Sequence, residues 1–522
     1  MDERLEWTPP GAGLWFAIRG HFPGPSTEQF VGLFPEAAGA GFTRGVAAYG
    51  VPLELRFAAV NNVMYSQLRA SPRETWPALE VTSVATLASQ RWCADYENWR
   101  ACERPAFIAA NKRLQGVALE SLDDAGLVEQ VRACTLHARR CITRHMELTA
   151  PSLPVGLYLA AAVARGIALE DAADRLGGAS PATRAAFDGV RLIAAALGDR
   201  ELGDDDSIAD VRAASPDAAA ALDDYLSEFG WRITSKFDVD GRCLIELPDV
   251  VLHSVRSART LDGRPPPAEG VPPASDLEPL WNAARAMHGC EDDNAGVTWV
   301  WPMGLVRRVL LEVGDRLAEA GQLSDASHVV MLTDLEIDRL LTRETCVSPE
   351  AVAARVARRE RVASEGHPPT LGAAEPLPTE SMPPALRCVT EAMLSLFAVW
   401  RTAERPPLHG VGIGSTTVRA RARVARDPAE ALASLRAGEI LVTAFTTPAY
   451  NAALMHAAGI VVEEGGPLIH AAVLARELGI PAVVGARGAR EHIANGDEIE
   501  LDPQAGEVRV LTSDAGHWTV RS

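Results

Sequence analysis

The chain has 522 residues, of which 47% are hydrophobic and 23% are charged, a composition typical of a globular protein rather than a disordered one. Its net charge of −19 argues against a nucleic-acid surface, since such a surface needs concentrated basic residues. No apolar run reaches the roughly 18 residues of a membrane span, so no membrane-spanning segment is expected.

The N-terminus and the cysteines indicate the compartment. The first residues, MDERLEWTPPGAG, are acidic and rich in proline, without the basic start and apolar stretch of a signal peptide. The eight cysteines are scattered, with no C-x-x-C pair and no histidine at zinc-ligand spacing. We therefore expect a cytoplasmic protein with free thiols and no metal site.

Residues 1 to about 400 are expected to be mainly helical. Within the first 110 residues some β-structure is expected, and residues 57–71, FAAVNNVMYSQLRAS, fit either a strand or a helix. From about Leu119 to Leu341 the apolar residues recur at helical spacing. Residues 362–384 have repeated prolines and few large apolar residues, which predicts a linker, and one amphipathic helix follows.

The sequence changes character at His409, where short β-branched runs begin to alternate with Ala-rich runs. The pattern predicts helices between strands, a hairpin in DEIELDPQAGEVRVL, and strands in GSTTVRARARVA, GEILVTAF, AGIVVEEG and PAVVG. Alternation of this kind over roughly 100 residues is typical of one compact α/β domain.

One histidine of this domain follows a Gly-Gly-Pro turn. Gly465 and Gly466 allow a tight turn and a close approach to a bound group, and Pro467 suits a first helical turn. A helix N-terminus favours phosphate, because its free N–H groups and its dipole are positive there. His470 would lie in that first turn, where a neutral imidazole is a competent nucleophile toward phosphorus. The alternative is a core or capping histidine.

Three segments carry a family resemblance: GEILVTAFTTPAY, AAGIVVEEGGPLIHAAVLARELGIPAVVG and NGDEIELDPQAGEV. In this order they strongly resemble the swivelling phosphohistidine domain of the phosphoenolpyruvate-utilising enzymes. That family includes pyruvate phosphate dikinase, phosphoenolpyruvate synthase and rifampin phosphotransferase. The resemblance implies that His470 carries a phosphoryl group and that the domain swings between two sites.

Earlier segments look like the acceptor-binding part of the same family, namely HFPGPSTEQF, DYLSEFGWRITSKFDV, CEDDNAG and residues 305–341. The resemblance implies an α+β multidomain chain. A mainly helical acceptor-binding domain, residues 1–400 with a linker at about 362–384, would be followed by a compact α/β swivelling domain, residues 408–522.

Two parts of the family pattern are missing from these residues. No Gly-rich phosphate loop with a nearby lysine occurs, since the only lysines are Lys112 and Lys236. The sequence is thus similar to rifampin phosphotransferase and phosphoenolpyruvate synthase but lacks their ATP-grasp domain, and it lacks the barrel of the dikinases. It resembles phenylphosphate synthase, whose parts lie on separate subunits. We therefore expect no tightly bound cofactor, and ATP and Mg²⁺ at a separate ATP-grasp protein.

Two substitutions depart from the family pattern. Ile469 stands where the family has a serine or threonine before the histidine, and Gly230-Trp231-Arg232 stands where it has Gly-His-Arg. A candidate base for the acceptor hydroxyl is therefore absent. Phosphoryl transfer depends mainly on positioning and charge, so the loss of a base need not stop it.

The candidate cations around the phosphoryl group are Arg232, Arg307 and Arg308, because a planar guanidinium can hold two phosphate oxygens at once. Arg307 and Arg308 are adjacent on a predicted helix, point about 100° apart, and are not expected to face the site together. Surface ion pairs are the alternative for each.

Other candidates have plain structural alternatives. Glu291 and Asp293 are candidates to orient a substrate, or they belong to a solvated helix start. Thr446 and Thr447 would bond the phosphoryl group or cap a helix. Arg476 would face the partner site or pair locally. The aromatic residues that would line an apolar acceptor pocket, or belong to the core, are Trp15, Phe16, Phe22 and Trp231.

These features indicate a phosphotransferase component that relays a phosphoryl group through His470 to a hydroxyl of a small organic molecule. Two alternatives remain. The first is an enzyme of specialised metabolism in which phosphorylation drives dehydration or substitution, suggested by Trp231 and Ile469. The second is a non-catalytic binding module that has lost phosphotransfer.

Overall fold

The computed structural model consists of two compact units, each built from three stretches of chain. The first unit comprises Met1–Leu153, Trp231–Cys243 and Asn294–Glu391, and the second comprises Pro154–Gly230, Leu244–Asp293 and Ala392–Ser522. The structure describes residues 5–19, 21–22, 24–177, 181–203, 205–234, 237–260, 272–273, 276–344, 346–400, 405–446, 450–454 and 457–512. Within these ranges it does not describe the side chains of residues 181–184, 257, 259–260, 291–292, 399–400, 429, 451–452 and 477.

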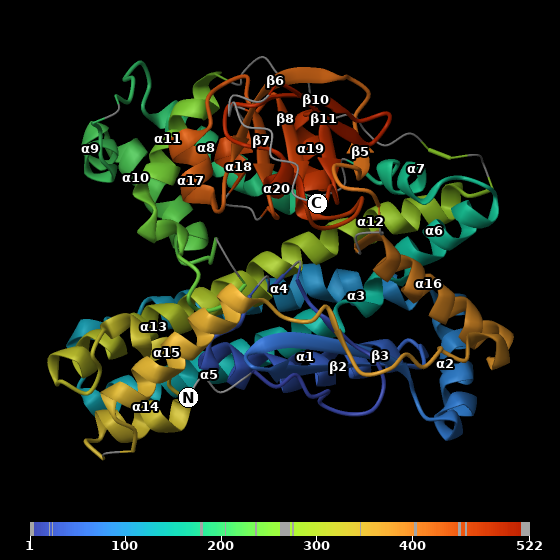
Figure 1. Ribbon diagram of the computed structural model, residues 1–522, viewed down its shortest axis with the longest axis horizontal. Helices are drawn as coiled ribbons and strands as arrows, with labels where there is room; N and C mark the ends of the chain where they lie inside the picture. The colour runs from blue at the N-terminus through green and yellow to red at the C-terminus, as the bar shows by residue number, and fades with distance from the viewer. Residues whose placement is uncertain are drawn as a thin grey trace. The chain divides into compact units, whose positions relative to one another are not determined.

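The first unit contains a four-stranded antiparallel sheet in the order β2-β3-β1-β4 (Figure 1). Its strands are β1 (Trp15–Ala17), β2 (Leu53–Val60), β3 (Val63–Ala70) and β4 (Thr370–Leu371). The turn between β2 and β3 is Asn61-Asn62, whose φ angles of 50° and 63° suit a two-residue hairpin turn. The segment that fitted either a strand or a helix is therefore a hairpin.

Helices make up the rest of the first unit: α1 (Glu28–Ala47), α2 (Trp76–Ser89), α3 (Arg91–Asn98), α4 (Arg104–Gln115), α5 (Asp124–Glu147), α13 (Trp301–Glu319), α14 (Asp334–Leu341) and α15 (Pro349–Glu365). α1 packs closely on α5, because Gly41 and Gly45 face its backbone. A Cβ at Gly41 would lie 2.3 Å from the Thr143 carbonyl oxygen, and one at Gly45 would lie 2.6 Å from the Glu147 carbonyl oxygen. Only glycine allows this approach of two helices.

The predicted linker, residues 362–384, is partly built into the first unit. Its first residues are the end of α15, and β4 within it pairs with Trp15 and Phe16 of β1. The Tyr65 hydroxyl donates a hydrogen bond of 2.9 Å to the Pro368 carbonyl. This part of the predicted linker is therefore anchored to the sheet.

The second unit contains a seven-stranded sheet in the order β11-β10-β6-β7-β8-β9-β5 (Figure 1). Its strands are β5 (Val411–Ile413), β6 (Val418–Val424), β7 (Ile440–Thr443), β8 (Gly459–Val462), β9 (Ala482–Val484), β10 (Glu498–Asp502) and β11 (Glu507–Thr512). Strands β6 to β9 are parallel, while β5, β10 and β11 pair antiparallel. β7, β8 and β9 are buried throughout, as apolar central strands are.

The helices of the second unit come from two parts of the chain. Those from the middle of the chain are α6 (Leu153–Ala164), α7 (Leu169–Asp174), α8 (Pro181–Ala196), α9 (Ile208–Ala214), α10 (Pro216–Tyr225) and α11 (Pro248–Thr260), and α12 (Glu278–Ala295) crosses into the first unit. Those near the C-terminus are α17 (Pro428–Ser434), α18 (Asn451–Leu454), α19 (His470–Leu478) and α20 (Ala489–His492), and α16 (Pro384–Trp400) crosses between the units.

The compact units do not coincide with the predicted domains 1–400 and 408–522. One hydrophobic core joins residues of α8, α10 and α11 to the C-terminal α/β domain, including Val190, Leu222, Val251, Leu454 and Leu474. Because of this shared core, the middle helices belong with the C-terminal sheet in the second unit. The fold class is nevertheless α+β, as expected, and the helical first unit also contains a sheet.

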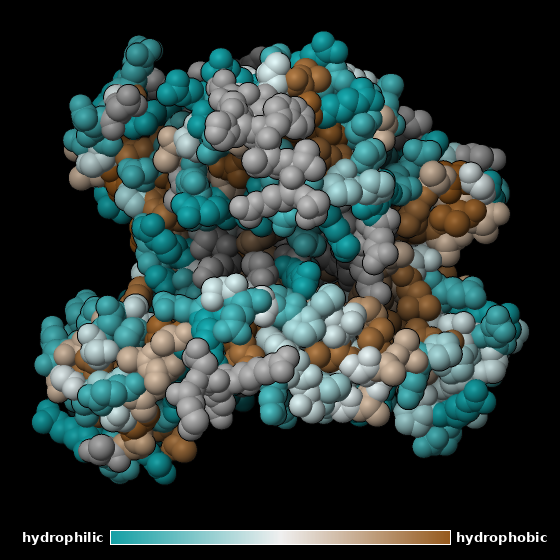
Figure 2. Space-filling model, in the orientation of Figure 1, coloured by the Kyte–Doolittle hydropathy of each residue, from teal (hydrophilic) through white to brown (hydrophobic). Residues whose placement is uncertain are grey.

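One helical stretch, Asp124–Ala164, is long and apolar enough to cross a membrane by length and composition alone. Of its most apolar window, 67% is buried inside the structure, as in the core helix of a globular protein. Hydrophilic residues cover most of the face shown in Figure 2, and hydrophobic residues occupy small separate areas there.

Candidate active site

A turn between β8 and α19 carries His470. Gly465 has a φ of +98°, and a Cβ there would lie 2.6 Å from the side chain of Ile469. Ile469 is the N-cap of α19 and has an extended backbone. The helix therefore begins at His470, and Pro467 lies before the helix rather than in its first turn as expected. Glycine at position 465 is required both by the φ angle and by the packing of Ile469.

The parallel strands β7 and β8 bring Thr446 to His470. Thr443 and Val462 are opposite each other at the carboxyl ends of the two strands, and the Glu463 N–H donates to the Thr443 carbonyl over 3.1 Å. The loops that follow the strands therefore start side by side. The Thr446 hydroxyl oxygen lies 3.1 Å from Nδ1 of His470, and both Thr446 and the other ring nitrogen, Nε2, are buried.

This contact constrains the chemistry of the imidazole. A hydroxyl can donate or accept, so Thr446 can hold either tautomer of the ring. If Nδ1–H donates to Thr446, the lone pair of the ring is on Nε2, which makes Nε2 the nucleophile. Thr447, the second candidate threonine, lies outside the described residues.

The N-terminus of α19 has no side-chain cap. The side chain of Ile469 has no oxygen, and no side-chain hydrogen bond caps this helix end. A serine or threonine at an N-cap would occupy one N–H of the first turn. No side-chain cap therefore occupies the N–H groups of the first turn, and the dipole of this nine-residue helix favours negative charge at that end.

Arg476 anchors the histidine turn to α7. Its Nε donates to Asp174 over 2.7 Å, Nη2 also contacts Asp174, and Nη1 donates to the Pro467 carbonyl. The side chain of Arg476 is 9% exposed and that of Asp174 46% exposed. Burial lowers the pKa of Arg476, which the charge of Asp174 opposes. Arg476 therefore pairs locally and positions the turn, one of the two roles considered for it.

The three candidate phosphate-binding arginines lie in the first unit and have different partners. The Arg232 guanidinium lies 5.3 Å from the ring centre of Trp301, and Arg307 donates to the Val239 carbonyl over 3.3 Å. Arg308 donates to the Val117 carbonyl over 2.7 Å. The adjacent Arg307 and Arg308 therefore contact different parts of the unit.

Trp231 has a packing role. The Arg308 guanidinium lies 5.5 Å from the centre of its ring, and a Cβ at Gly304 would lie only 1.7 Å from its carbonyl oxygen. Burial lowers the pKa of Arg308, as expected for a guanidinium held against a ring and a carbonyl. Trp231 is therefore fixed by contacts above its ring and along its backbone.

The two acidic candidates, Glu291 and Asp293, lie on α12. The side chain of Glu291 lies outside the described residues, and Asp293 lies on α12 in the part assigned to the second unit. Trp231 and Asp293 therefore belong to different units, each of which is described by itself.

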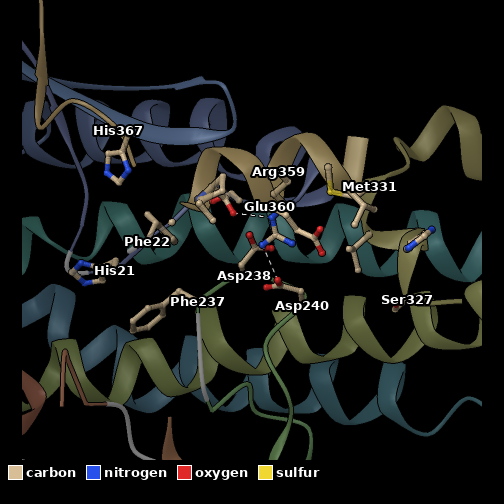
Figure 3. A pocket seen from close by; sticks show the side chains of 17 residues that line it. His21, Phe22, Phe237, Asp238, Asp240, Ser327, Met331, Arg359, Glu360 and His367 are labelled. Carbon is tan, nitrogen blue, oxygen red and sulfur yellow. Dashed lines mark hydrogen bonds and ion pairs between the residues drawn. The ribbon is translucent and has the colours of Figure 1, made fainter. Parts of the chain in front are cut away.

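The first unit contains a cavity of about 570 Å³ that the sequence did not reveal as such. Four stretches distant in sequence line it: His21, Phe22, Gly24, Pro25 and Ser26; Phe237, Asp238 and Asp240; Ser327, His328, Val330 and Met331; and Val356, Arg359, Glu360, Ala363 and His367. Figure 3 shows the charged residues near its centre and the aromatic residues toward one end. Of the aromatic residues predicted to line a pocket, Phe22 does so, whereas Trp15 is buried in a separate core cluster of the first unit.

The carboxylates of the cavity are held in place. Asp238 is buried and accepts hydrogen bonds from the Thr27 N–H (2.8 Å) and the Thr27 hydroxyl (2.6 Å). Arg359 donates to Asp240 over 2.7 Å and to the Pro25 carbonyl over 2.8 Å. Burial and the nearby charge of Asp240 raise the pKa of Asp238 to about 6. Asp238 lies in the quoted segment DYLSEFGWRITSKFDV, so an acidic residue beside Phe237 was the signal available in the sequence.

Comparisons with known proteins match the region that contains the histidine turn. Residues 435–506 match the family model of the PEP-utilising enzyme, mobile domain. A rifampicin phosphotransferase of a Streptomyces species is 31% identical over 322 residues, which cover 57% of this chain and 35% of that protein. The phosphoenolpyruvate synthase of Aquifex aeolicus is 45% identical over 98 residues, 19% of this chain and 11% of that enzyme.

Similarity also extends over most of the chain. An uncharacterized protein of Mycobacterium tuberculosis is 30% identical over 424 residues, 78% of this chain and 45% of the relative. The chain thus spans less than half the length of these relatives.

Proposed function

Because the chain belongs to the family of phosphoenolpyruvate-utilising enzymes, we propose that it is a phosphotransferase that relays a phosphoryl group through His470 to a hydroxyl of a small organic molecule. The observation that carries this proposal is the contact between Thr446 and Nδ1 of His470 at the start of α19. It holds the imidazole at a helix terminus suited to phosphate, and an Nδ1–H donated to Thr446 makes Nε2 the attacking nitrogen.

The relay has two steps. In the first step, the Nε2 lone pair attacks phosphorus of the donor, and the bond from phosphorus to the donor's leaving oxygen breaks. Nδ1–H of His470 keeps its proton and its hydrogen bond to the Thr446 hydroxyl. In the second, the acceptor hydroxyl oxygen attacks phosphorus, the P–N bond breaks with its electron pair returning to Nε2, and the hydroxyl proton passes to water. The N–H groups at the start of α19, beside Gly465 and Gly466, stabilise the phosphoryl oxygens.

The remaining site residues keep proposed roles. Arg232 and Arg307 provide positive charge for the phosphoryl group as it is transferred, and their guanidinium groups suit this task. Arg308 acts indirectly, since it is held by the Val117 carbonyl and the Trp231 ring and positions Trp231. The buried core around Trp301 holds Arg232 in turn.

The donor chemistry is proposed to lie on another polypeptide. The 522 residues contain two lysines and no Gly-rich loop of the kind that binds nucleotide phosphates. We therefore assign the binding of ATP and Mg²⁺ to a separate protein of the ATP-grasp type, which charges His470 in the cytoplasm. Phosphoenolpyruvate is the other donor that the experiment below must include.

The test is intact-protein mass spectrometry after incubation with ATP and Mg²⁺, with phosphoenolpyruvate, and with ATP plus a candidate ATP-grasp protein. We expect a gain of one acid-labile phosphoryl group with one of these donors, and its loss when an acceptor is added after the donor has been removed. No gain with any donor would refute the relay. A chase that releases inorganic phosphate and a dehydrated or substituted product would instead establish the alternative reaction.

Replacing Thr446 by valine is expected to slow the charging of His470 by about fivefold. Valine has the shape of threonine but no hydroxyl, and a hydrogen bond to a partly buried group is worth about 1 kcal/mol. Thr446→Ser keeps the hydroxyl and should charge at nearly the wild-type rate. The measurement is the rate of phosphoryl gain by mass spectrometry, and equal rates for the valine and wild-type proteins would exclude a role for Thr446 in orienting the ring.

A further inference from the structure

The cavity of the first unit is assembled from segments that the sequence separates widely. HFPGPSTEQF supplies its first group of lining residues, the stretch after Trp231 its second, η8 (Ala326–Met331) its third, and α15 with the residues after it the fourth. A volume of about 570 Å³ lies within the range of cavities that enclose a small organic molecule.

The charge of the cavity is unbalanced. Asp238, Asp240 and Glu360 line it, and Arg359 is the cation among the lining residues that the structure describes. Arg359 is already engaged by Asp240 and by the Pro25 carbonyl. Burial and the charge of Arg19 lower the pKa of His367, so this histidine adds no positive charge at neutral pH. Three carboxylates against one guanidinium leave an excess of negative charge.

The walls of the cavity are apolar. Phe22 and Phe237 lie toward one end of it in Figure 3, and Met331 lies toward the other. Aromatic and thioether side chains bind the body of an apolar or aromatic ligand. Glu360 is exposed, so a ligand with an apolar body that covers it must also neutralise its carboxylate, because burying that charge unpaired would cost free energy.

We propose that this cavity binds the phosphoryl acceptor, and that the acceptor is a hydroxylated molecule with an aromatic or other apolar body and a protonated amine. This inference rests on the proposed function. The amine faces Glu360 and Asp240, and the apolar body lies against Phe22 and Phe237. A metal ion is the other ligand that carboxylates would select, but no group of three or more metal-ligating side chains occurs among the residues that the structure describes.

The test measures binding to the His470→Asn protein, which cannot be charged. The probes are a matched set of phenols: 4-(2-aminoethyl)phenol, which is cationic, 4-ethylphenol, which is neutral, and 3-(4-hydroxyphenyl)propionate, which is anionic. We expect the amine to bind about tenfold more tightly than the neutral phenol, with a preference that falls as salt rises. Equal or tighter binding of the neutral or anionic phenol, or no binding of the amine at about 10 mM, would overturn the proposal.

Variants connect the preference to the cavity. Glu360→Gln should lower the preference for the amine about threefold, because Glu360 is exposed and an exposed ion pair is weak. Glu319→Gln removes the same charge at the exposed end of α13, outside the cavity lining, and should leave the preference unchanged. Val356→Trp fills the cavity and should weaken binding of every probe, and unchanged binding would place the probes elsewhere.

The result of the binding test can be distinguished from the result of the test for phosphoryl relay. Charging of wild-type His470 is measured without any probe. A protein that is charged but does not prefer the amine refutes only the acceptor class. A protein that binds the amine in the cavity but is never charged refutes the phosphoryl relay, and with it the role of the ligand as acceptor, but supports the ligand class assigned to the cavity.

Discussion

Replacing His470 by asparagine is expected to abolish phosphoryl gain from every donor and to lower transfer to an acceptor by at least about 10³-fold. Asparagine keeps a planar polar group at the first residue of α19 and can still bond the Thr446 hydroxyl, but the lone pair of its amide nitrogen is delocalised into the carbonyl and does not attack phosphorus. The loss should therefore come from chemistry rather than from folding.

The matched control is His492→Asn. His492 is an exposed histidine on α20 in the same unit, and its Nδ1 lies 2.7 Å from the Gly488 carbonyl oxygen. This variant should gain one phosphoryl group as the wild-type protein does. Thermal unfolding should show only a small change for His470→Asn, because one hydrogen bond of about 1 kcal/mol is at stake. An acid-labile phosphoryl group that persists in His470→Asn would place the carrier elsewhere.

The strands and the helix start of the C-terminal domain could be predicted from the sequence because their signals lie within short segments. Runs such as GEILVTAF and AGIVVEEG are continuous apolar strands, and the glycine turn with the following Ala-rich run predicts a helix start. The structure has β7, β8 and α19 at these places. The residues of the β2–β3 hairpin fit either a strand or a helix by periodicity, although Asn61-Asn62 is a turn signal of the same local kind.

The contacts that define the candidate site could not be predicted from the sequence. Thr446 meets His470 only because β7 and β8 pair in a particular register, and Arg476 meets Asp174 across 302 positions of sequence. The acidic cavity combines four distant stretches, and its Arg359 was not singled out from the sequence. Periodicity reports which face of an element is buried, not which element covers it.

The same limit explains the domain boundaries. Helices α8, α10 and α11 show the ordinary period of amphipathic helices, so they were grouped with the helical region before them. Their apolar faces share a core with the C-terminal sheet, which only the structure reveals. Likewise, β4 is two residues long within a proline-rich stretch, too short to be recognised as a strand.

The second large effect concerns the ion pair that anchors the histidine turn. Asp174→Ala would leave the buried guanidinium of Arg476 without its partner carboxylate. Breaking a buried pair in this way costs about 3 kcal/mol, the lower end of the usual range, because Asp174 is partly exposed and water can reach the gap. Arg476→Met should cost less, since it removes the buried charge, keeps an apolar stem, and leaves Asp174 in water.

Hydrogen exchange of the amides of α19, followed by mass spectrometry, measures this difference within one unit of the chain. We expect Asp174→Ala to exchange faster than Arg476→Met, and the double variant to resemble Arg476→Met, because the charge that needs a partner is then gone. Asp276→Ala is the matched control. It breaks the ion pair between Asp276 and Arg165, whose side chains are 57% and 46% exposed, respectively. Such an exposed pair contributes about 1 kcal/mol or less. If Arg476→Met loosened α19 as much as Asp174→Ala, the cost would come from lost packing or the lost bond to Pro467 rather than from an unpaired buried charge.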